Sequence, residues 1–463
     1  MLNCTAKRLK EIGPNTLLVG IDIGKKKHAC VMMDLGAQVL GRFKFSNSRQ
    51  GFEKLLERVY MVQTETQSNH LLFGMEPSGH YWRNLAYFLE GQGHRFRLVN
   101  PFTLKRHREG QDLSRTKNDY RDAAMVAELL RTGKFTLTRL TYGQRAELRR
   151  TFILYTRLVD DRARQKTLLR GVPDCLFPEF TQVFKDPLGL TARAVLLACP
   201  APHKIREKGL EEFASLVREA YRGRRLTLGK LRALHEVAKE SIGIQAENRA
   251  LALEVRTILQ LIELLDCQIE EVEAQLIEQF LALEESIYLL SIKGIGPITG
   301  AGILAEIGDI STYQSVKSLT KLGGINPSQN DSGGHRGTYT PMTKKGRARL
   351  RRVVYQAALC CIAHNPVFQA DYRRLRERKR NPLPRMKAVG AMMNKLLRVV
   401  YALLKERRVF EEEYEWQVRS LPSAFGILPA LARPVPDPTG SRDGRPGRVP
   451  QHPKEVRVAT LVA

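Results

Sequence analysis

The sequence lacks the features that mark secreted, membrane-spanning and zinc-binding proteins. Its seven cysteines include no Cys-x-x-Cys pair, and their odd number suits a reduced cytosolic protein better than a disulfide framework. No uninterrupted apolar run approaches the roughly 18 residues that span a bilayer, and MLNCTAKRLKEIGPN at the start lacks the apolar segment of a signal peptide. These absences predict a cytoplasmic protein with no membrane partner and no zinc site.

Acidic residues are also scarce relative to basic ones. The 463 residues include 75 Lys and Arg against 48 Asp and Glu, which gives a net charge of +27 and an isoelectric point near 10.0. Such an excess is typical of a protein that binds a polyanion, nucleic acid first of all. The length predicts two or three domains.

The first 150 residues have an alternating pattern of strands and helices. Apolar alternation between residues 16 and 45 predicts three short strands in an antiparallel meander, followed by a helix capped by Asn47 or Ser48. Strands at 70–76 and 96–101, with a helix between them, then predict parallel crossovers. This part is therefore expected to be an α/β domain.

The remainder is predicted to be mostly helical, so the whole chain reads as α/β plus all-α. Residues 140–285 are helical with Pro-bearing interruptions near GVPDCLFPEF and LLACPAPHK. The terminal segment after residue 420 is rich in Pro, Gly and Arg and is predicted to be a disordered basic tail. The expected division is 15–150, 151–285, 286–415 and 420–463.

A heptad pattern stands out in the helical middle. Apolar residues keep a four-three spacing typical of a coiled-coil seam. They are Leu251, Val255, Ile258, Ile262, Leu265, Ile269, Val272 and Leu276. Two readings remain open, a long helix packed within its own domain and a coiled coil between protomers.

Two carboxylates are expected at the carboxyl ends of buried strands. Asp22 lies in LLVGIDIGKKKH between Ile21 and Ile23, so its side chain faces away from theirs. Glu76 ends LLFGME directly before the breaker PSGH. Sites in open α/β sheets form beyond the carboxyl ends of strands, where both acids would lie.

A second pair of carboxylates, Asp119 and Asp122 in RTKNDYRDAA, lies at a helix start. Asp119 as N-cap and Asp122 in a capping-box position is the structural alternative. If the pair instead faces Asp22 and Glu76, four acids would hold Mg²⁺ or Mn²⁺, which prefer hard oxygen ligands. The neighbouring Lys25, Lys117 and Arg121, with other basic residues, would then bind phosphate.

The segment from Ser291 onward is glycine-rich and basic. In SIKGIGPITGAG, Gly294 and Gly296 precede Pro297, which suits the first turn of a helix. This turn is either a phosphate cradle, as in helix-hairpin-helix DNA-binding elements, or a plain turn between helices.

Further along, two serines lie among cations in LGGINPSQNDSGGHRGTYTPMTKKGRARLRR. A serine can attack phosphorus where cations stabilise the developing charge, and Gly333 and Gly334 would let a phosphate approach Ser332. Ser328 is the reserve, and a surface turn is the alternative. The nearby cations are Lys321, His335, Arg336, Lys344, Lys345, Arg347 and Arg349.

The ordered set of motifs resembles one family across about residues 15 to 415. GIDIGKKKH, GMEPSGHYW, LVNP, RTKNDYRDA, IKGIGPITGAGILAEIGD, LGGINPSQNDSGG and TKKGRARLRR occur in the order seen in transposases of the insertion-sequence one-ten family, bridge-RNA-guided DNA recombinases. The resemblance implies an N-terminal RNase H-like (RuvC-like resolvase) domain, a central coiled-coil region and a C-terminal transposase domain. Many relatives have a serine where this chain has Asp331.

The resemblance also implies site residues and partners. The family's DEDD tetrad falls on Asp22, Glu76, Asp119 and Asp122, and its nucleophilic serine falls on Ser332. It implies Mg²⁺ at the tetrad, DNA ends and target as substrates, a structured guide RNA, and a homodimer that assembles to a homotetramer.

Two other functions remain open at this stage. A metal-dependent junction resolvase or nuclease would use only the four carboxylates and water. A non-enzymatic nucleic-acid-binding assembly protein would use the acids only as caps, which leaves Asp22 within an apolar strand unexplained.

Overall fold

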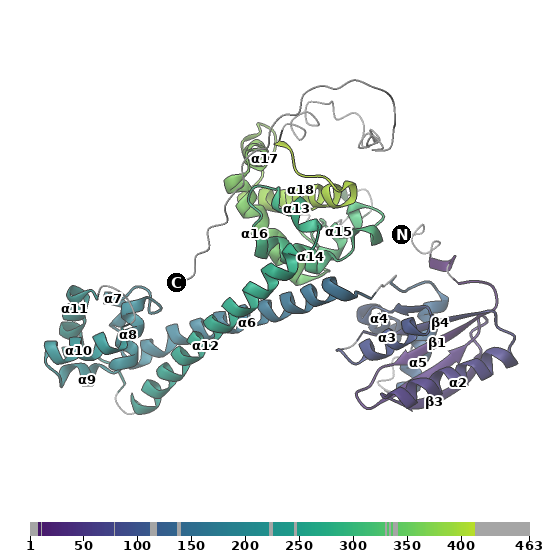
Figure 1. Ribbon diagram of the computed structural model, residues 1–463, viewed down its shortest axis with the longest axis horizontal. Coiled ribbons are helices and arrows are strands. Elements are labelled where there is room, and N and C mark those ends of the chain that lie inside the picture. The colour runs from purple at the N-terminus through teal and green to yellow at the C-terminus, as the bar shows by residue number, and fades with distance from the viewer. Residues whose placement is uncertain are drawn as a thin grey trace, which may run out of the picture. The chain divides into compact units, whose positions relative to one another are not determined.

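The computed structural model (Figure 1) describes most of the chain. The described residues are 8–10, 12–77, 79–111, 118–136, 140–221, 226–244, 248–328, 331–332, 335–336 and 341–412. The residues up to Phe410 form one compact unit. The predicted tail at 420–463 and Lys117 lie outside the described residues. Within the described part of the chain, no helix combines the length and the apolar character that crossing a membrane requires.

A mixed five-stranded sheet forms the N-terminal part, in the order β3-β2-β1-β4-β5. Its strands are β1 Thr16–Asp22, β2 Lys27–Met33, β3 Val39–Ser46, β4 His70–Met75 and β5 Phe96–Leu98. The first three pair in antiparallel fashion, whereas β1, β4 and β5 are parallel. Both the predicted meander and the predicted parallel crossovers are confirmed.

Helices cover both faces of this sheet. They are α2 Arg49–Glu65, α3 Trp82–Gly91, α4 Pro101–Gln111 and α5 Asp119–Arg131. Ser48 is the N-cap of α2, and its Oγ accepts a hydrogen bond from the Gly51 N–H at 3.2 Å. Alternate residues of β1 separate two cores, since Leu17 and Val19 pack with α2 and α3, whereas Leu18 packs with α5.

Two glycines lie where α5 packs against the sheet. Gly20 of β1 and Gly74 of β4 are register partners on neighbouring parallel strands. A Cβ at Gly20 would lie 2.1 Å from the carbonyl oxygen of Ala123 and 2.6 Å from the backbone nitrogen of Ala127. The atoms nearest to a Cβ at Gly74 all belong to the Leu130 side chain, the first of them at 2.6 Å. The missing side chains therefore let the backbone of α5 lie directly on β1.

A long antiparallel pair of helices dominates the middle of the chain. The helices here are α6 Gly143–Leu176, α7 Phe180–Val183, α8 Leu190–Ala198, α9 Pro202–Arg206, α10 Leu210–Ala220, α11 Leu228–Lys239 and α12 Asn248–Leu281. Helices α6 and α12 run side by side (Figure 1). The predicted interruption near GVPDCLFPEF is confirmed, because α6 ends at Leu176 and α7 begins at Phe180, although Pro173 itself still lies within α6.

The heptad seam of α12 is used within the chain. Val255, Ile258 and Ile262 are buried in a core with α8 and the carboxyl end of α6. Leu276 is buried in another core, which also contains Leu148 from the start of α6. Of the two readings of the pattern, the structure therefore supports a helix packed in its own chain for these residues.

The C-terminal helices enclose a single apolar core. The elements are α13 Glu285–Leu290, α14 Pro297–Ile307, the 3-10 helix η1 Ile310–Thr312, α15 Val316–Gly323, β6 Asp331–Ser332, β7 His335–Arg336, α16 Ala348–His364, α17 Pro366–Glu377 and α18 Arg385–Glu406. This core also takes in Phe152 of α6. The start of α6 is thus part of the C-terminal packing.

Candidate functional site

The carboxyl ends of β1 and β4 bring two acids to one edge of the sheet. Asp22 is the last residue of β1, and Glu76 directly follows β4. Ile21 is the register partner of Met75, so the two acids continue neighbouring strands at the same level. Both are half-buried.

The helix α5 brings Asp119 to the same face. Its N-cap is Asn118, whose side-chain oxygen accepts a hydrogen bond from the Tyr120 N–H at 3.0 Å. The structural alternative in which Asp119 is the N-cap is therefore wrong, because Asp119 is the first residue of the helix. Because Asn118 satisfies the helix end, the Asp119 carboxylate binds the Nζ of Lys44 at 2.5 Å.

Lys44 links Asp119 to Asp22. It lies on β3 in register with Ala29, which is in register with Asp22, so all three side chains face α5. The pKa of Lys44 is raised, first by its hydrogen bond to Asp119, with Asp22 among the further causes. The ammonium group thus lies in the field of both carboxylates.

Asp122 is the most buried acid of the tetrad. Its side chain is 5% exposed, and its Oδ1 lies 2.8 Å from a terminal nitrogen of Arg108 on α4. The Nε of Arg108 is buried without a hydrogen-bond partner among the described residues. A charge this deeply buried requires a cationic partner, and Arg108 supplies it.

Lys44 and Arg108 were not identified as site residues from the sequence. Residue alternation offered a signal for Lys44, because it falls on the face of β3 that Asp22 occupies in β1. No signal was available for Arg108, since the sequence predicted no helix over residues 101–111.

The four acids do not converge into a closed metal site in this arrangement. Among the described residues, no three side chains of His, Cys, Asp or Glu lie close enough together to hold a metal ion. The donor set still has the right chemistry, because carboxylate oxygens suit Mg²⁺. The positions that a cation would neutralise are held here by Lys44 and Arg108.

The turn that follows β1 carries exposed lysines, and two hydrogen bonds with its neighbours hold it in place. Asn47 donates its side-chain amide to the carbonyl of Lys25 at 3.2 Å, and the Gly24 N–H donates to Nδ1 of His28 at 3.1 Å. His28 is fully buried beside Phe45 and Phe52. Burial lowers the pKa of His28, so its imidazole is neutral at pH 7 and can accept this hydrogen bond.

We expect His28 to make the protein less stable in acid. Because the pKa of His28 in the folded protein lies below the ordinary value of 6.5 for histidine, its contribution to stability is full above pH 6.5 and is lost as the pH falls toward the folded pKa. His28→Asn keeps an acceptor for Gly24 but does not titrate. Urea midpoints measured between pH 7 and pH 5 should therefore fall less steeply in His28→Asn than in the natural protein, whereas equal slopes would contradict this role.

Of the two candidate serines, the structure describes the side chain of Ser328 but only the backbone of Ser332. The Oγ of Ser328 donates a hydrogen bond to the carbonyl of Pro341 at 2.9 Å. Ser332 lies in β6, paired with His335 of β7, and its side chain and that of Arg336 lie outside the described residues. Ser328 thus closes the base of the segment that carries Ser332.

Of the candidate phosphate-binding residues in the C-terminal part, some are exposed and others are held by packing or by an ion pair. A Cβ at Gly294 would lie 2.8 Å from the backbone nitrogen of Cys361, whereas Gly296 is open, so close packing against α16 explains Gly294. Lys344 and Lys345 are exposed just before α16. Arg347 and Arg349 instead bind Glu306, a buried residue that was not among the predicted site residues.

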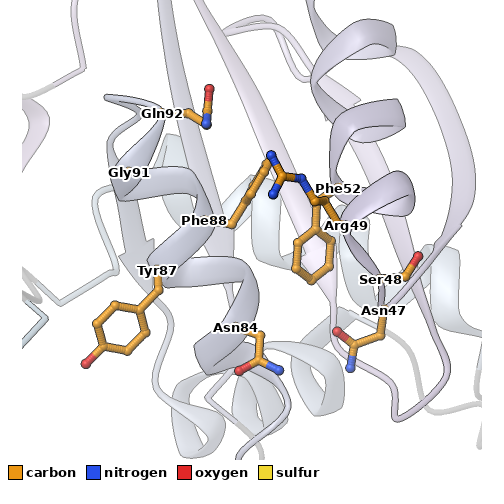
Figure 2. A pocket seen from close by; sticks show the side chains of 9 residues that line it. All are labelled: Asn47, Ser48, Arg49, Phe52, Asn84, Tyr87, Phe88, Gly91 and Gln92. Carbon is orange, nitrogen blue, oxygen red and sulfur yellow. The ribbon is translucent and has the colours of Figure 1, made fainter.

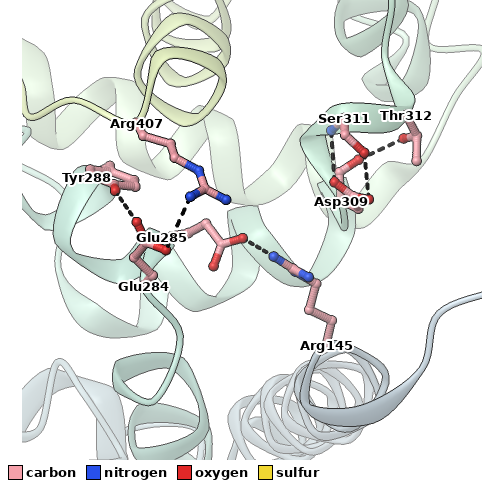
Figure 3. Close-up of polar contacts among 8 residues, drawn as sticks. All are labelled: Arg145, Glu284, Glu285, Tyr288, Asp309, Ser311, Thr312 and Arg407. Carbon is pink, nitrogen blue, oxygen red and sulfur yellow. Dashed lines mark hydrogen bonds and ion pairs between the residues drawn. The ribbon is translucent and has the colours of Figure 1, made fainter. Parts of the chain in front are cut away.

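Two surface hollows are lined by residues other than the four acids of the predicted tetrad. The first lies between α2 and α3, and Figure 2 shows the rings of Phe52 and Phe88 beside Arg49. The second lies where α6, α13 and α18 meet, and Figure 3 shows its ion pairs. There Arg145 binds Glu285, and Arg407 lies 4.0 Å from Glu284, so each of these two glutamates has a basic partner.

Comparison with known proteins identifies two matched regions. Residues 19–178 match a family described as "Transposase", of the DEDD type. Residues 287–373 match the "Transposase IS116/IS110/IS902 family". The matches include all four acids in the first region and Glu306, Ser332 and Arg349 in the second.

Several relatives match nearly end to end. The IS116 44.8 kDa protein of Streptomyces clavuligerus is 24% identical, over 85% of this chain and 95% of its own length. The IS900 42 kDa protein of Mycobacterium paratuberculosis is 26% identical, over 84% and 96%. A pilin gene-inverting protein of Moraxella bovis is 24% identical, over 85% and 97%.

These matches exclude the non-enzymatic assembly protein that the sequence alone left open. They run through both regions in the order of the motifs, and their descriptions name transposases. The chain belongs to the IS110 family of transposases, and it is a DNA transposase.

Proposed function

We propose that this transposase cuts and rejoins DNA strands at the ends of an insertion sequence through a covalent serine intermediate. Relatives named as pilin gene-inverting proteins support this, because inversion of a DNA segment requires that every cut strand be rejoined. A covalent intermediate keeps the energy of the broken phosphodiester, so that rejoining needs no ATP.

The observation that carries the proposal is the placement of α5 on β1. Gly20 lets the helix approach, and Asp119 and Asp22 then act on the same ammonium group. Acids at the carboxyl ends of β1 and β4 support an RNase H-like (RuvC-like) domain for residues 15–150. Asp22, Glu76, Asp119 and Asp122 are its proposed acidic tetrad.

A transposase domain of the DEDD type generally implies the use of a divalent metal ion, and we assign Mg²⁺ or Mn²⁺ to the tetrad. The ion would stabilise charge on the oxygens of the reacting phosphate. Its binding requires that Lys44 leave Asp119 and that Arg108 share Asp122. Both cations would then be available to contact phosphate, as would Lys25 and Arg121.

Ser332 is the proposed nucleophile. Its Oγ attacks phosphorus, a bond forms between Oγ and phosphorus, and the bond from phosphorus to the leaving sugar oxygen breaks. The serine proton passes to a base, and the leaving oxygen takes up a proton to become a hydroxyl group. Attack by a hydroxyl of the partner strand reverses these steps and frees the serine.

We further propose that a structured RNA guides the protein and that it assembles as a homodimer and then a homotetramer. With a net charge of +27, the chain can make many backbone contacts to RNA and DNA. The seam of α12 is buried within the chain, so protomers would join through the outer face of the α6 and α12 pair. Leu168, Leu253 and Leu264 are 47%, 62% and 54% exposed there.

Ser332→Ala is expected to abolish both strand cleavage and the covalent protein–DNA adduct. Ser328→Ala is the matched control and should retain both, because the Ser328 hydroxyl already donates to Pro341. The measurement is gel detection of adduct on labelled element-end DNA, with protein purified together with RNA from its element. Cleavage that persists in Ser332→Ala would favour a metal-dependent resolvase, and the lack of any specific RNA would refute guidance.

A further inference from the structure

Two arginines bind one buried carboxylate near the place where α6, α14 and α16 meet, and a third arginine lies within the electrostatic field of that carboxylate. Glu306 of α14 is 1% exposed, and its Oε1 accepts a hydrogen bond from the Nε of Arg349 at 3.0 Å. Arg347 donates to the backbone carbonyl of Glu306 and lies 3.8 Å from its Oε2. Arg149 of α6 lies in the field of the same groups.

One helical turn away from these charged residues, α6, α14 and α16 pack closely through apolar side chains, and this packing fixes their positions along one another. Gly302 is one turn before Glu306 on α14, and a Cβ there would lie 2.6 Å from Phe152 and 2.9 Å from Val353. Phe152 follows Arg149 by one turn of α6, as Val353 follows Arg349 on α16. The three helices therefore contact one another through apolar residues at one turn, and their charged residues lie together at the next turn.

The cluster has more positive than negative charge. Two guanidinium groups bind one carboxylate and a third lies in its field, whereas in the hollow of Figure 3 the carboxylates of Glu284 and Glu285 each have an arginine partner. Burial lowers the pKa of Arg149, and Arg347 and Arg349 add to this effect. The Nε of Arg149 is buried and has no hydrogen-bond partner within the described part of the chain. Groups of this kind need an acceptor, and phosphate oxygens suit arginine.

The position of the cluster indicates which phosphate it would meet. Ser328 and Pro341 are hydrogen-bonded across the base of the segment that carries Ser332, and Pro327 pairs with Met342. Arg347 follows this base closely, and its N–H donates to the carbonyl of Leu322 at 2.6 Å. Arg347 therefore lies only a few residues along the chain from the base of the segment that carries Ser332.

We propose that Arg149, Arg347 and Arg349 bind one backbone phosphate of the DNA strand that is cut, a role that rests on the proposed strand-transfer function. Glu306 is the positioning residue of this site, because it orients the guanidinium groups of Arg347 and Arg349. Arg149 supplies a buried donor, its Nε, for which the described residues offer no acceptor. RNA offers the same phosphate chemistry, but the neighbouring Ser332 segment favours the reacting DNA.

Arg149→Met tests the site in the full-length protein, because methionine keeps an apolar stem against the neighbouring helices. On a short duplex DNA we expect an affinity loss of roughly tenfold at low salt, and a decrease of about one in the salt-dependence slope. The urea midpoint should stay equal or rise, since an incompletely paired buried charge is removed. Arg170→Met, an exposed residue of the same helix, should change neither quantity.

Other outcomes would overturn the assignment. An unchanged slope together with a lower urea midpoint would make Arg149 a structural ion-pair residue, and a loss confined to a single-stranded RNA of equal length would exclude the DNA strand. Failure of the strand-transfer function would look different, since the natural protein would then form no adduct while Arg149→Met still weakened DNA binding.

Glu306→Gln tests the positioning role separately. The amide oxygen can still accept from Arg349, but the charge that orders the guanidinium groups is lost. We expect duplex affinity to stay within about twofold, while the rate of adduct formation at saturating DNA falls roughly tenfold. If affinity, urea midpoint and rate all fell together, Glu306 would have only a structural role.

Discussion

Gly20→Ala is expected to destabilise the N-terminal domain and to reduce strand cleavage by about a hundredfold. The new Cβ would lie 2.1 Å from a backbone oxygen and 2.6 Å from a backbone nitrogen of α5. Backbone atoms cannot rotate away, so the whole helix must move outward, at a cost of about 2 to 3 kcal/mol. Asp119 and Asp122 move with it, and a displacement of about 1 Å can reduce a rate by about a hundredfold.

Two other glycines provide matched controls. The nearest contacts of the new Cβ in Gly74→Ala are with the Leu130 side chain, which can change rotamer, so we expect a smaller loss of stability and of cleavage. Gly91→Ala at the end of α3 meets nothing within 4 Å and should leave cleavage unchanged. Urea midpoints and cleavage rates should therefore rank Gly20→Ala lowest, then Gly74→Ala, then Gly91→Ala. A Gly20→Ala protein that matched the natural protein would show that α5 does not rest on β1 in this way.

Much of the sheet could be predicted because strand alternation is a local property. The β1 sequence LLVGID alternates between two apolar cores, and the same alternation places Asp22 toward α5. The seam of α12 was equally visible, but a seam specifies an apolar face and not its partner. Only long-range packing shows that α6 of the same chain covers it.

The charged partners were hard to predict for a different reason. Asn118 and Asp119 are both good N-cap residues, and only the structure shows that Asn118 caps and Asp119 binds Lys44. Arginines are numerous in this chain, so nothing singled out Arg108 or Arg149. Glu306 did have a signal, since it is the one charge in GPITGAGILAEIG. A lone acid in an apolar segment drew attention to Asp22, and the same rule applies to Glu306.

Asp22→Asn is expected to abolish strand cleavage, with a loss of about a thousandfold or more. The amide cannot balance the charge of a divalent ion, and such an ion supplies several kcal/mol of transition-state stabilisation, each 1.36 kcal/mol being about tenfold in rate. The second readout needs no activity. Mg²⁺ should raise the melting temperature of the natural protein in proportion to its affinity, and Asp22→Asn should lose this rise.

Removing Lys44, the partner of Asp119, is expected to strengthen Mg²⁺ binding, the opposite of the effect of Asp22→Asn. Lys44 occupies the carboxylate that the ion would need, so Lys44→Met should lower the Mg²⁺ concentration that gives half of the rise in melting temperature. Glu57→Gln, which removes an exposed acid on α2, is the control and should leave the Mg²⁺ response unchanged. If Mg²⁺ stabilised Asp22→Asn and the natural protein equally, the tetrad would not be the metal site, and the acids would serve only to hold Lys44 and Arg108. Lost binding in Asp22→Asn with tighter binding in Lys44→Met would show that ammonium and metal compete for the same oxygens.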